Sequence, residues 1–537
     1  MRKSWKKYLI ALSVLTYFVL GSLRADESLL FGGIKREELA NKKGTFVFEE
    51  LCFMTGEPVL LRGTVVIPPK NPEKDEYSVT LKYALASADK KIKLDRSVTY
   101  DVVNKKNPEL NQVISNWTVK SGGIKETVSI EGEVFTLSSY EFDNSMISDL
   151  KPAGQFDNAS LHYKKVFHTA EPHLDEGKKI SITGDSQTFA SYKNFWSGVN
   201  STKINQKIEF ETLPGSTLQR KYGPKDGKKP EEKNTNWQAD VIYSFSEKVQ
   251  SKFDYVKHGA KNTSFRKGLL KSTNYEYNVS YDYNLPSQTA TAGEKENGQG
   301  EKAPDTAKRK TGKIDLDAYR YDSSTMLPIP KYNDVAAHWA EESIFKMASL
   351  GGFDLDSSFF PDVTITRAQF ARAILNAIDS VEPESPEKRK TEFIKSQRKG
   401  AKELPFDDVR RDSEYYVFVE AVNEREMMFG EGDRQFLPNR PLTREEAITI
   451  MIRSLGVDDV APSLPFETVF LDDDRIAGWA KPSIYQAVDF GIIDGYEDGT
   501  IKPKKLMTRA EASQMLVGYI EHMRKEIPKD YKRLLQE

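Results

Sequence analysis

Cysteine is almost absent from this sequence, because Cys52 is the single one among 537 residues. No intrachain disulfide can form, and an exported chain without disulfides is more typical of a bacterial envelope than of a eukaryotic secretory route. We interpret Cys52, which lies in an apolar predicted strand, as an inert core residue.

Long apolar runs are equally scarce. The one present, at 8–20, is shorter than the about 20 residues that a membrane-spanning helix needs. It follows a basic segment at 1–7 and precedes Leu23-Arg24-Ala25, which could serve as a cleavage site. We therefore predict a secretory signal peptide at 1–25 and no membrane span once it is removed.

An excess of charge of one sign is also missing, since 78 Lys and Arg residues face 80 Asp and Glu residues. This balance argues against a nucleic-acid partner, which would require a basic surface. His168 and His173 lack the spacing of a helical zinc motif, and Pro172 would break a helix between them. We expect no metal and no cofactor.

The region 26–325 shows the alternation of apolar and polar residues that is typical of half-buried strands. Tyr77, Val79, Leu81, Tyr83 and Leu85 alternate strictly. Further strands are expected at 45–53, 59–67, 92–102, 126–142, 203–213, 237–256 and 275–285. The pattern predicts one large, or two smaller, antiparallel all-β domains.

A polar, low-complexity segment near 287–312 interrupts the β-rich region. It could be a linker between domains or a disordered loop within a hairpin. Because 313–321 has the pattern of one more strand, we favour the loop and place the domain junction after it.

A repeated Thr-Arg motif organises the last third of the chain. Its copies are Thr366-Arg367-Ala368-Gln369, Thr443-Arg444-Glu445-Glu446 and Thr508-Arg509-Ala510-Glu511. Each matches a helical capping box and precedes an apolar stripe at helical spacing. An Arg at the first helical position is disfavoured by roughly 0.3–1 kcal/mol. Three such residues indicate a shared task, which is either to hold an anion beside the free helix amides or to pair with an Asp of the same repeat.

The similarity continues upstream of each motif. An aromatic or aliphatic residue and one or two acidic residues come first, as in Asn333-Asp334, Asp407-Asp408 and Asp472-Asp473. Trp339 and Trp479 follow in the first and third copies, and a Gly-rich loop at 491–503 is clearest in the third. Repetition of this kind is typical of units that bury their apolar faces against each other.

These repeated motifs resemble the S-layer homology (SLH) family, most clearly at 333–340, at 491–503 and in the Thr-Arg copies. The resemblance implies an all-α, pseudo-three-fold bundle of three SLH repeats, at 330–381, 405–456 and 468–523. A charged loop at 382–404 would separate the first two repeats, and a C-terminal tail would occupy 524–537.

The resemblance also implies a binding site for a secondary cell-wall polymer, in many members a pyruvylated glycan, or for peptidoglycan. The residues carried over are Arg367, Arg444 and Arg509 as carboxylate binders, Trp339 and Trp479 as apolar walls, and Asp334, Asp408, Asp473 and Gly495 in the grooves between repeats.

We therefore expect a secreted, non-catalytic protein of the bacterial cell wall or S-layer that displays a β-rich domain and can self-assemble. The alternative is a wall-anchored polysaccharide-active enzyme, or an adhesin, with its site in the β-rich region. Glu49 and Glu50 are adjacent on a predicted strand and point to opposite faces, which does not suit the paired carboxylates of a glycosidase.

Overall fold

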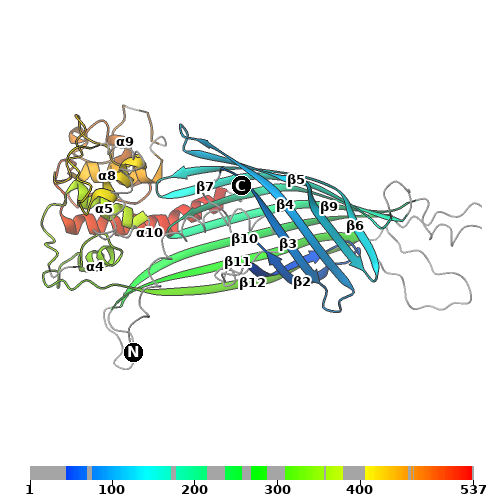
Figure 1. Ribbon diagram of the computed structural model, residues 1–537. Coiled ribbons are helices and arrows are strands. Elements are labelled where there is room, and N and C mark those ends of the chain that lie inside the picture. The colour runs from blue at the N-terminus through cyan, green and yellow to red at the C-terminus, as the bar shows by residue number, and fades with distance from the viewer. Residues whose placement is uncertain are drawn as a thin grey trace, which may run out of the picture.

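The computed structural model describes residues 44–534, except 69–74, 171–176, 214–235, 257–267, 287–308, 356–357, 379–405, 458–460 and 464. The predicted signal peptide at 1–25 and the charged loop at 382–404 lie outside the described residues. Within them, a β-rich region is followed by a helical region (Figure 1).

The described residues of the β-rich region form one sheet of twelve antiparallel strands, and each strand pairs with its neighbours in the chain. The strands are β1 (Thr45–Cys52), β2 (Val59–Val66), β3 (Glu76–Ala86), β4 (Ile92–Asn107), β5 (Gln112–Ile130), β6 (Glu133–Lys151), β7 (Gly154–His168), β8 (Lys178–Asn194), β9 (Ser197–Thr212), β10 (Trp237–Val256), β11 (Gly268–Pro286) and β12 (Arg309–Leu327). The prediction of an antiparallel all-β region is confirmed, and the sheet is single.

One face of the sheet carries its core. Along β10, Val241, Tyr243 and Phe245 are buried, and the residues between them are not, as the two-residue period of a strand requires. The sheet curves so that distant strands meet on this face (Figure 1). Phe53, which follows β1, contacts Tyr281 of β11. The core therefore lies inside the curved sheet.

Two stretches of the sheet differ from the predicted strands. The prediction of one strand at 126–142 is wrong, because Glu131 and Gly132, both with positive φ, form a two-residue turn between β5 and β6. Strands β7 and β8 were not predicted. In β7 the buried face includes Asp157 and Lys165, which interrupt the apolar alternation.

The last two strands decide between a loop and a linker at 287–312. Strands β11 and β12 pair with each other, so the segment that joins them belongs to the sheet region rather than to a domain boundary. The expected strand at 313–321 is confirmed as part of β12. Residues 287–308, for which disorder was expected, lie outside the described residues.

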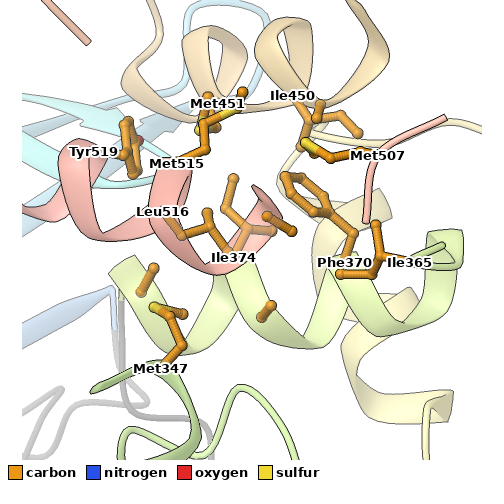
Figure 2. Packing of buried hydrophobic residues seen from close by; sticks show 14 of the residues in the cluster. Met347, Ile365, Phe370, Ile374, Ile450, Met451, Met507, Met515, Leu516 and Tyr519 are labelled. Atoms are coloured by element: carbon orange, nitrogen blue, oxygen red, sulfur yellow. The ribbon is translucent and has the colours of Figure 1, made fainter. Parts of the chain in front are cut away.

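In the described part of the helical region there are three pairs of helices, with α4 (Glu341–Ser349) and α5 (Arg367–Ile378), α7 (Tyr416–Glu424) and α8 (Arg444–Leu455), and α9 (Lys481–Asp489) and α10 (Arg509–Leu534). A short 3-10 helix, η3 (Asp473–Arg475), precedes α9. Figure 2 shows that Phe370 and Ile374 of α5, Met451 of α8 and Leu516 of α10 meet in a shared core. No helix in the described part of the chain has the length and apolar character needed to cross a bilayer.

Helix α10 is longer than the repeat that it belongs to. Residues 524–534, which we assigned to a C-terminal tail, continue the helix toward the sheet (Figure 1). Tyr531, near its end, packs against Phe156 and Tyr192 of the sheet at ring-centroid distances of 5.7 and 5.9 Å. The end of α10 is thus fixed by contacts with β7 and β8.

The sheet and the helical region share one hydrophobic cluster. Trp196, in the turn between β8 and β9, is fully buried in it, and its Nε1 donates a hydrogen bond of 2.6 Å to the carbonyl oxygen of Ala377 at the end of α5. Asn194 and Ser197 both donate to the carbonyl oxygen of Met523 in α10. The two regions are therefore packed together rather than joined by a free linker.

Candidate functional site

The three Thr-Arg motifs each begin the second helix of a pair and form the expected capping boxes. In every copy, the Thr amide donates to the acid or amide side chain three residues on, and that residue's amide is bonded back to the Thr hydroxyl. The pairs are Thr366 with Gln369, Thr443 with Glu446, and Thr508 with Glu511. The local sequence thus fixes where each Arg begins its helix.

Each of these helix starts is bonded to the loop of another repeat. The amide of Arg367 donates to the carbonyl of Arg440, that of Arg444 to Lys505, and that of Arg509 to Val363. The first repeat therefore meets the second, the second meets the third, and the third meets the first. We call these contacts the 1–2, 2–3 and 3–1 junctions.

Three aspartates hold the loops that form these junctions. Asp334 accepts hydrogen bonds from the amides of Phe359 and Phe360, and Asp408 accepts them from Phe436 and Leu437. The same place in the third repeat belongs to Asp472, which accepts from the amides of Ile501 and Lys502. These carboxylates are occupied by backbone donors.

The predicted site residue Asp473 lies one position further on and has other partners. It accepts hydrogen bonds from Thr468 and forms an ion pair with Lys481 at 2.6 Å. Sequence comparison between the repeats was thus out of register by one residue at this point, because Asp472 and Asp473 are chemically alike.

The 1–2 junction encloses Arg367. This residue is 5% exposed, and its Nε and Nη2 donate to the carbonyl oxygens of Phe436 and Phe429 at 2.9 and 2.6 Å. Its guanidinium also lies over the Phe436 ring, with Glu431 at 3.7 Å from Nη1. Burial and the nearby Arg440 lower the pKa of Arg367. Two of its three nitrogens are therefore committed to the neighbouring repeat.

The 2–3 and 3–1 junctions leave their arginines much freer. Arg444 lies over the ring of Tyr496 at 4.9 Å, and Arg509 lies over that of Phe359 at 4.5 Å. Both Nε atoms are buried, and neither guanidinium has a hydrogen bond or ion pair to any residue that the structure describes. Burial lowers the pKa of Arg509. Both side chains are half-buried cations that keep unused donors.

The two predicted tryptophans are exposed aromatic residues of the helical region. Trp339 and Trp479 stand directly before α4 and α9 and are 64% and 53% exposed. In the second repeat the corresponding Tyr415 is instead partly buried against the core. Gly495 has a positive φ, and a Cβ there would lie 2.5 Å from the Phe470 ring, so this glycine shapes the loop.

Two aromatic rings that lie under the junction arginines, here called the aromatic floor, were not predicted from the sequence. Phe359 and Phe436 lie under Arg509 and Arg367, and each stands two residues before a proline that accepts the next helix amide, Pro361 or Pro438. The pattern of an apolar residue, any residue and proline recurs at Ile501 and Pro503. This pattern was present in the sequence and could have located the floor.

A second group of charged residues lies inside the curved sheet. Arg96 forms a two-point contact with Glu50 at 3.0 and 3.1 Å and an ion pair with Glu126 at 2.8 Å. Lys165 reaches the other oxygen of Glu126 at 2.7 Å. Burial would raise the pKa of Glu126, but the charges of Arg96 and Lys165 lower it to about 2.

The expectations for Cys52 and for the Glu49-Glu50 pair agree with this arrangement. Cys52 is buried, and burial raises the pKa of its thiol to about 12. Glu50 points into the sheet toward Arg96, whereas Glu49 pairs with the exposed Arg62. The cavity beside the cluster has a volume of about 60 Å³, well below the roughly 300–1,000 Å³ of small-molecule sites.

Comparison with known proteins assigns the helical region. The S-layer homology domain profile matches residues 331–371, 405–448 and 469–513. Exoglucanase XynX of Acetivibrio thermocellus is 29% identical over 196 residues, or 35% of this chain and 16% of that protein. Amylopullulanase of Thermoanaerobacterium thermosulfurigenes is 28% identical over 207 residues, or 38% of this chain and 10% of that protein.

A third relative is the surface-layer 125 kDa protein of Lysinibacillus sphaericus, 25% identical over 197 residues, or 36% of this chain and 15% of that protein. The match thus spans less than a fifth of the length of each of these three relatives. The resemblance noted in the sequence is confirmed. The chain carries three tandem S-layer homology domains after its β-sheet region and is a wall-attached protein of the bacterial cell surface.

Proposed function

We propose that the protein is a non-catalytic cell-surface component. Its SLH repeats would hold it on a secondary cell-wall polysaccharide without a covalent bond, and its β-sheet region would be displayed outward. One observation carries this proposal: Arg444 and Arg509 are half-buried cations over aromatic rings, without a carboxylate partner among the described residues.

The physical argument concerns unused donors. A partly buried guanidinium has lost water contacts, and the protein supplies no acceptor in exchange, so the arrangement is unfavourable until an anion arrives. A carboxylate can accept two parallel hydrogen bonds from a guanidinium, which gives both affinity and orientation. An acidic substituent on a glycan, such as a pyruvate ketal, has this chemistry.

The surroundings of these two arginines support a sugar ligand. The exposed Trp339 and Trp479 would act as apolar walls against sugar or ketal groups. Asp334, Asp408 and Asp473 would act indirectly, by holding the loops and helix starts around the ligand. The cyclic order of the three junctions is consistent with a pseudo-three-fold arrangement of the repeats.

The absence of catalysis is part of the same proposal. The buried carboxylates of Glu50 and Glu126 are committed to Arg96 and Lys165, and the cavity beside them is small. A shallow hollow of about 400 Å³ on β3, β4 and β5 is lined by two carboxylates, those of Asp95 and Glu126. Neither place offers two free carboxylates among the described residues.

The alternative is a wall-anchored enzyme acting on polysaccharides, or an adhesin. The observation that favours the enzyme is that two relatives are named as an exoglucanase and an amylopullulanase. Assay of the purified chain on wall polysaccharide and on soluble glucans and xylans would decide. Release of reducing ends that is lost in Asp95→Asn would favour the enzyme.

The anchor is tested with the full chain and isolated cell walls. We expect the protein to sediment with walls and to stay in solution once the secondary polymer has been extracted. The double variant Arg444→Ala, Arg509→Ala should lose most of this binding. The matched control is Arg410→Ala, which removes an exposed arginine from the second repeat. Normal binding by the double variant would assign the two arginines a structural role.

A further inference from the structure

The loops that face Arg367 and Arg444 differ at one position. In the second and third repeats, Gly430 and Gly495 each lie against a Phe ring, at 2.5 Å from the Cβ that either would carry. The residue after the glycine is Glu431 in one loop and Tyr496 in the other. The loop of the first repeat is two residues shorter and has no glycine there; Asp354, which stands as far before Phe359 as Glu431 does before Phe436, pairs with Arg372 at 2.6 Å.

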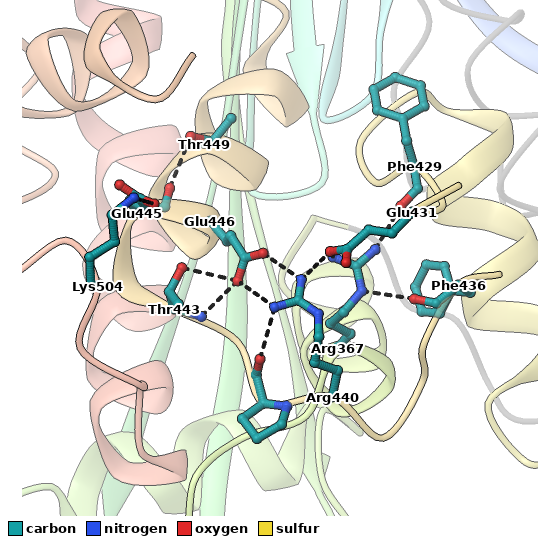
Figure 3. A network of polar contacts seen from close by, with 11 residues as sticks. Arg367, Phe429, Glu431, Phe436, Arg440, Thr443, Glu445, Glu446, Thr449 and Lys504 are labelled. Atoms are coloured by element: carbon teal, nitrogen blue, oxygen red, sulfur yellow. Dashed lines mark hydrogen bonds and ion pairs between the residues drawn. The ribbon is translucent and has the colours of Figure 1, made fainter. Parts of the chain in front are cut away.

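Glu431 directs its carboxylate at the only unused part of Arg367 (Figure 3). The Nε and Nη2 atoms of Arg367 are bonded to backbone carbonyls, and Nη1 faces Glu431 at 3.7 Å. The carboxylate of Glu431 is held in place by Arg440, whose guanidinium also binds Glu446 of the helix cap. Glu431 is thus anchored next to the site rather than freely moving.

Tyr496 makes the equivalent connection in the third repeat without a negative charge. Its hydroxyl donates to Glu511 at 3.1 Å and accepts from Lys505 at 3.2 Å, as Glu431 is connected to Glu446 through Arg440. Its ring supports the guanidinium of Arg444. The 2–3 junction therefore has the same framework as the 1–2 junction, but its arginine meets a ring where Arg367 meets a carboxylate.

We propose that Glu431 is a built-in anion that occupies the 1–2 junction. This inference rests on the proposed function, because it takes Arg444 and Arg509 as anion sites. The three repeats then hold two acidic substituents of the polymer, at the 2–3 and 3–1 junctions. The 1–2 junction is filled by the protein's own Glu431 and serves only to hold the first and second repeats together.

The competition follows from proximity. A group tethered beside a site acts at an effective concentration in the millimolar range or above, and here it is also oriented by Arg440. An external carboxylate would have to displace Glu431 from Arg367. The charge of Glu431 would then be balanced by Arg440 alone.

The experiment uses the full chain and, as the probe, a methyl hexoside that carries a pyruvate ketal across O4 and O6. Titration calorimetry of the unaltered protein should give two sites. In the Arg444→Ala, Arg509→Ala background it should give none, and adding Glu431→Gln should restore one. Glu431 is 46% exposed in its side chain, so this change should leave the fold intact.

Two controls tie the restored site to Glu431 and Arg367. Glu497→Gln removes the same charge from the corresponding loop of the third repeat and should restore nothing in the same background. Arg367→Ala, added to the Glu431→Gln triple variant, should abolish the restored site. The reciprocal change Tyr496→Glu, in the otherwise unaltered chain, should reduce two sites to one.

The failures of the two proposals are distinguishable. If the unaltered chain binds none of the probe, the assignment of Arg444 and Arg509 fails. If it binds two molecules but Glu431→Gln restores no site in the double variant, Glu431 is not what occupies the 1–2 junction. Three sites in the unaltered chain would also overturn the inference.

Discussion

The protein buries cations in two different ways, one inside the sheet and one between the repeats. In the sheet, Arg96 lies over Tyr83 and is neutralised by Glu50 and Glu126. Between the repeats, Arg509 lies over Phe359, without a carboxylate in contact with it in the described structure. Both arginines rest on a ring, and the difference lies in the acidic partners.

This difference separates a structural role from the binding role that we propose. A buried ion pair with its partners in place contributes little net stability but becomes very costly when one partner is removed. A half-buried cation without a partner contributes nothing that its removal would cost, and it is available to a ligand. The comparison therefore predicts opposite responses to mutation in the two regions.

The largest effect is expected for Glu126→Gln. Arg96 and Lys165 would remain buried with only Glu50 to neutralise them, and the loss in the free energy of unfolding should be about 3–5 kcal/mol. Urea denaturation followed by tryptophan fluorescence measures it. The control Glu131→Gln breaks an exposed pair with Lys91 and should cost no more than about 1 kcal/mol. Equal losses would mean that the interior cluster is not special.

Acid should weaken the sheet through the same carboxylate. The pKa of Glu126 in the folded protein is about 2, below its usual value of 4.5. A lowered pKa stabilises the fold above the unfolded-state pKa, and this contribution is lost as the pH falls from about 4.5 to about 2. Unfolding midpoints measured across this range should fall less steeply in Glu126→Gln than in the unaltered chain.

The repeats allow a sharper version of the comparison. Arg367→Ala should cost about 1–3 kcal/mol, because the buried carbonyl of Phe436 and the partly buried carbonyl of Phe429 lose their donors. Arg509→Ala should change stability by less than about 1 kcal/mol while it weakens binding to walls. Denaturation and wall sedimentation of the same two variants test both halves. Similar effects of the two changes on stability would remove the distinction between their junctions.

The smallest effect is expected for Arg410→Ala. Arg410 pairs with Asp412 at 2.8 Å, but both side chains are at least 70% exposed. Exposed pairs of this kind are worth about 0–1 kcal/mol and are weakened by salt. Thermal unfolding should hardly change at either low or high ionic strength. A loss above about 2 kcal/mol would show that exposure is a poor guide to the value of a charge in this protein.

The sequence predicted those features that depend on local patterns. The helix starts at Arg367, Arg444 and Arg509 were located correctly because capping boxes are local. The ranges of β1 and β10 were found because their buried faces are largely apolar or aromatic, although Glu247 and Ser251 are also buried in β10. Patterns of this kind need only a few neighbouring residues.

Features that depend on distant contacts were missed. The buried cluster of Arg96, Glu126 and Lys165 joins three strands, and charged residues at these positions look like solvent-facing ones in a sequence. The unequal state of the three junctions also escaped prediction, because it depends on Glu431 lying opposite Arg367 in another repeat. The identity of Asp472 was missed because its neighbour is also an aspartate.

The fully buried Trp196 and the last turns of α10 have a mechanical consequence. They join the sheet to the repeats through a common core and through hydrogen bonds to Ala377 and Met523. If the repeats hold the wall polymer as proposed, a force on the sheet is therefore transmitted directly to those contacts, because the two regions share one core. On the same proposal, the orientation of the sheet relative to the cell surface is set by the orientation in which the repeats bind the polymer.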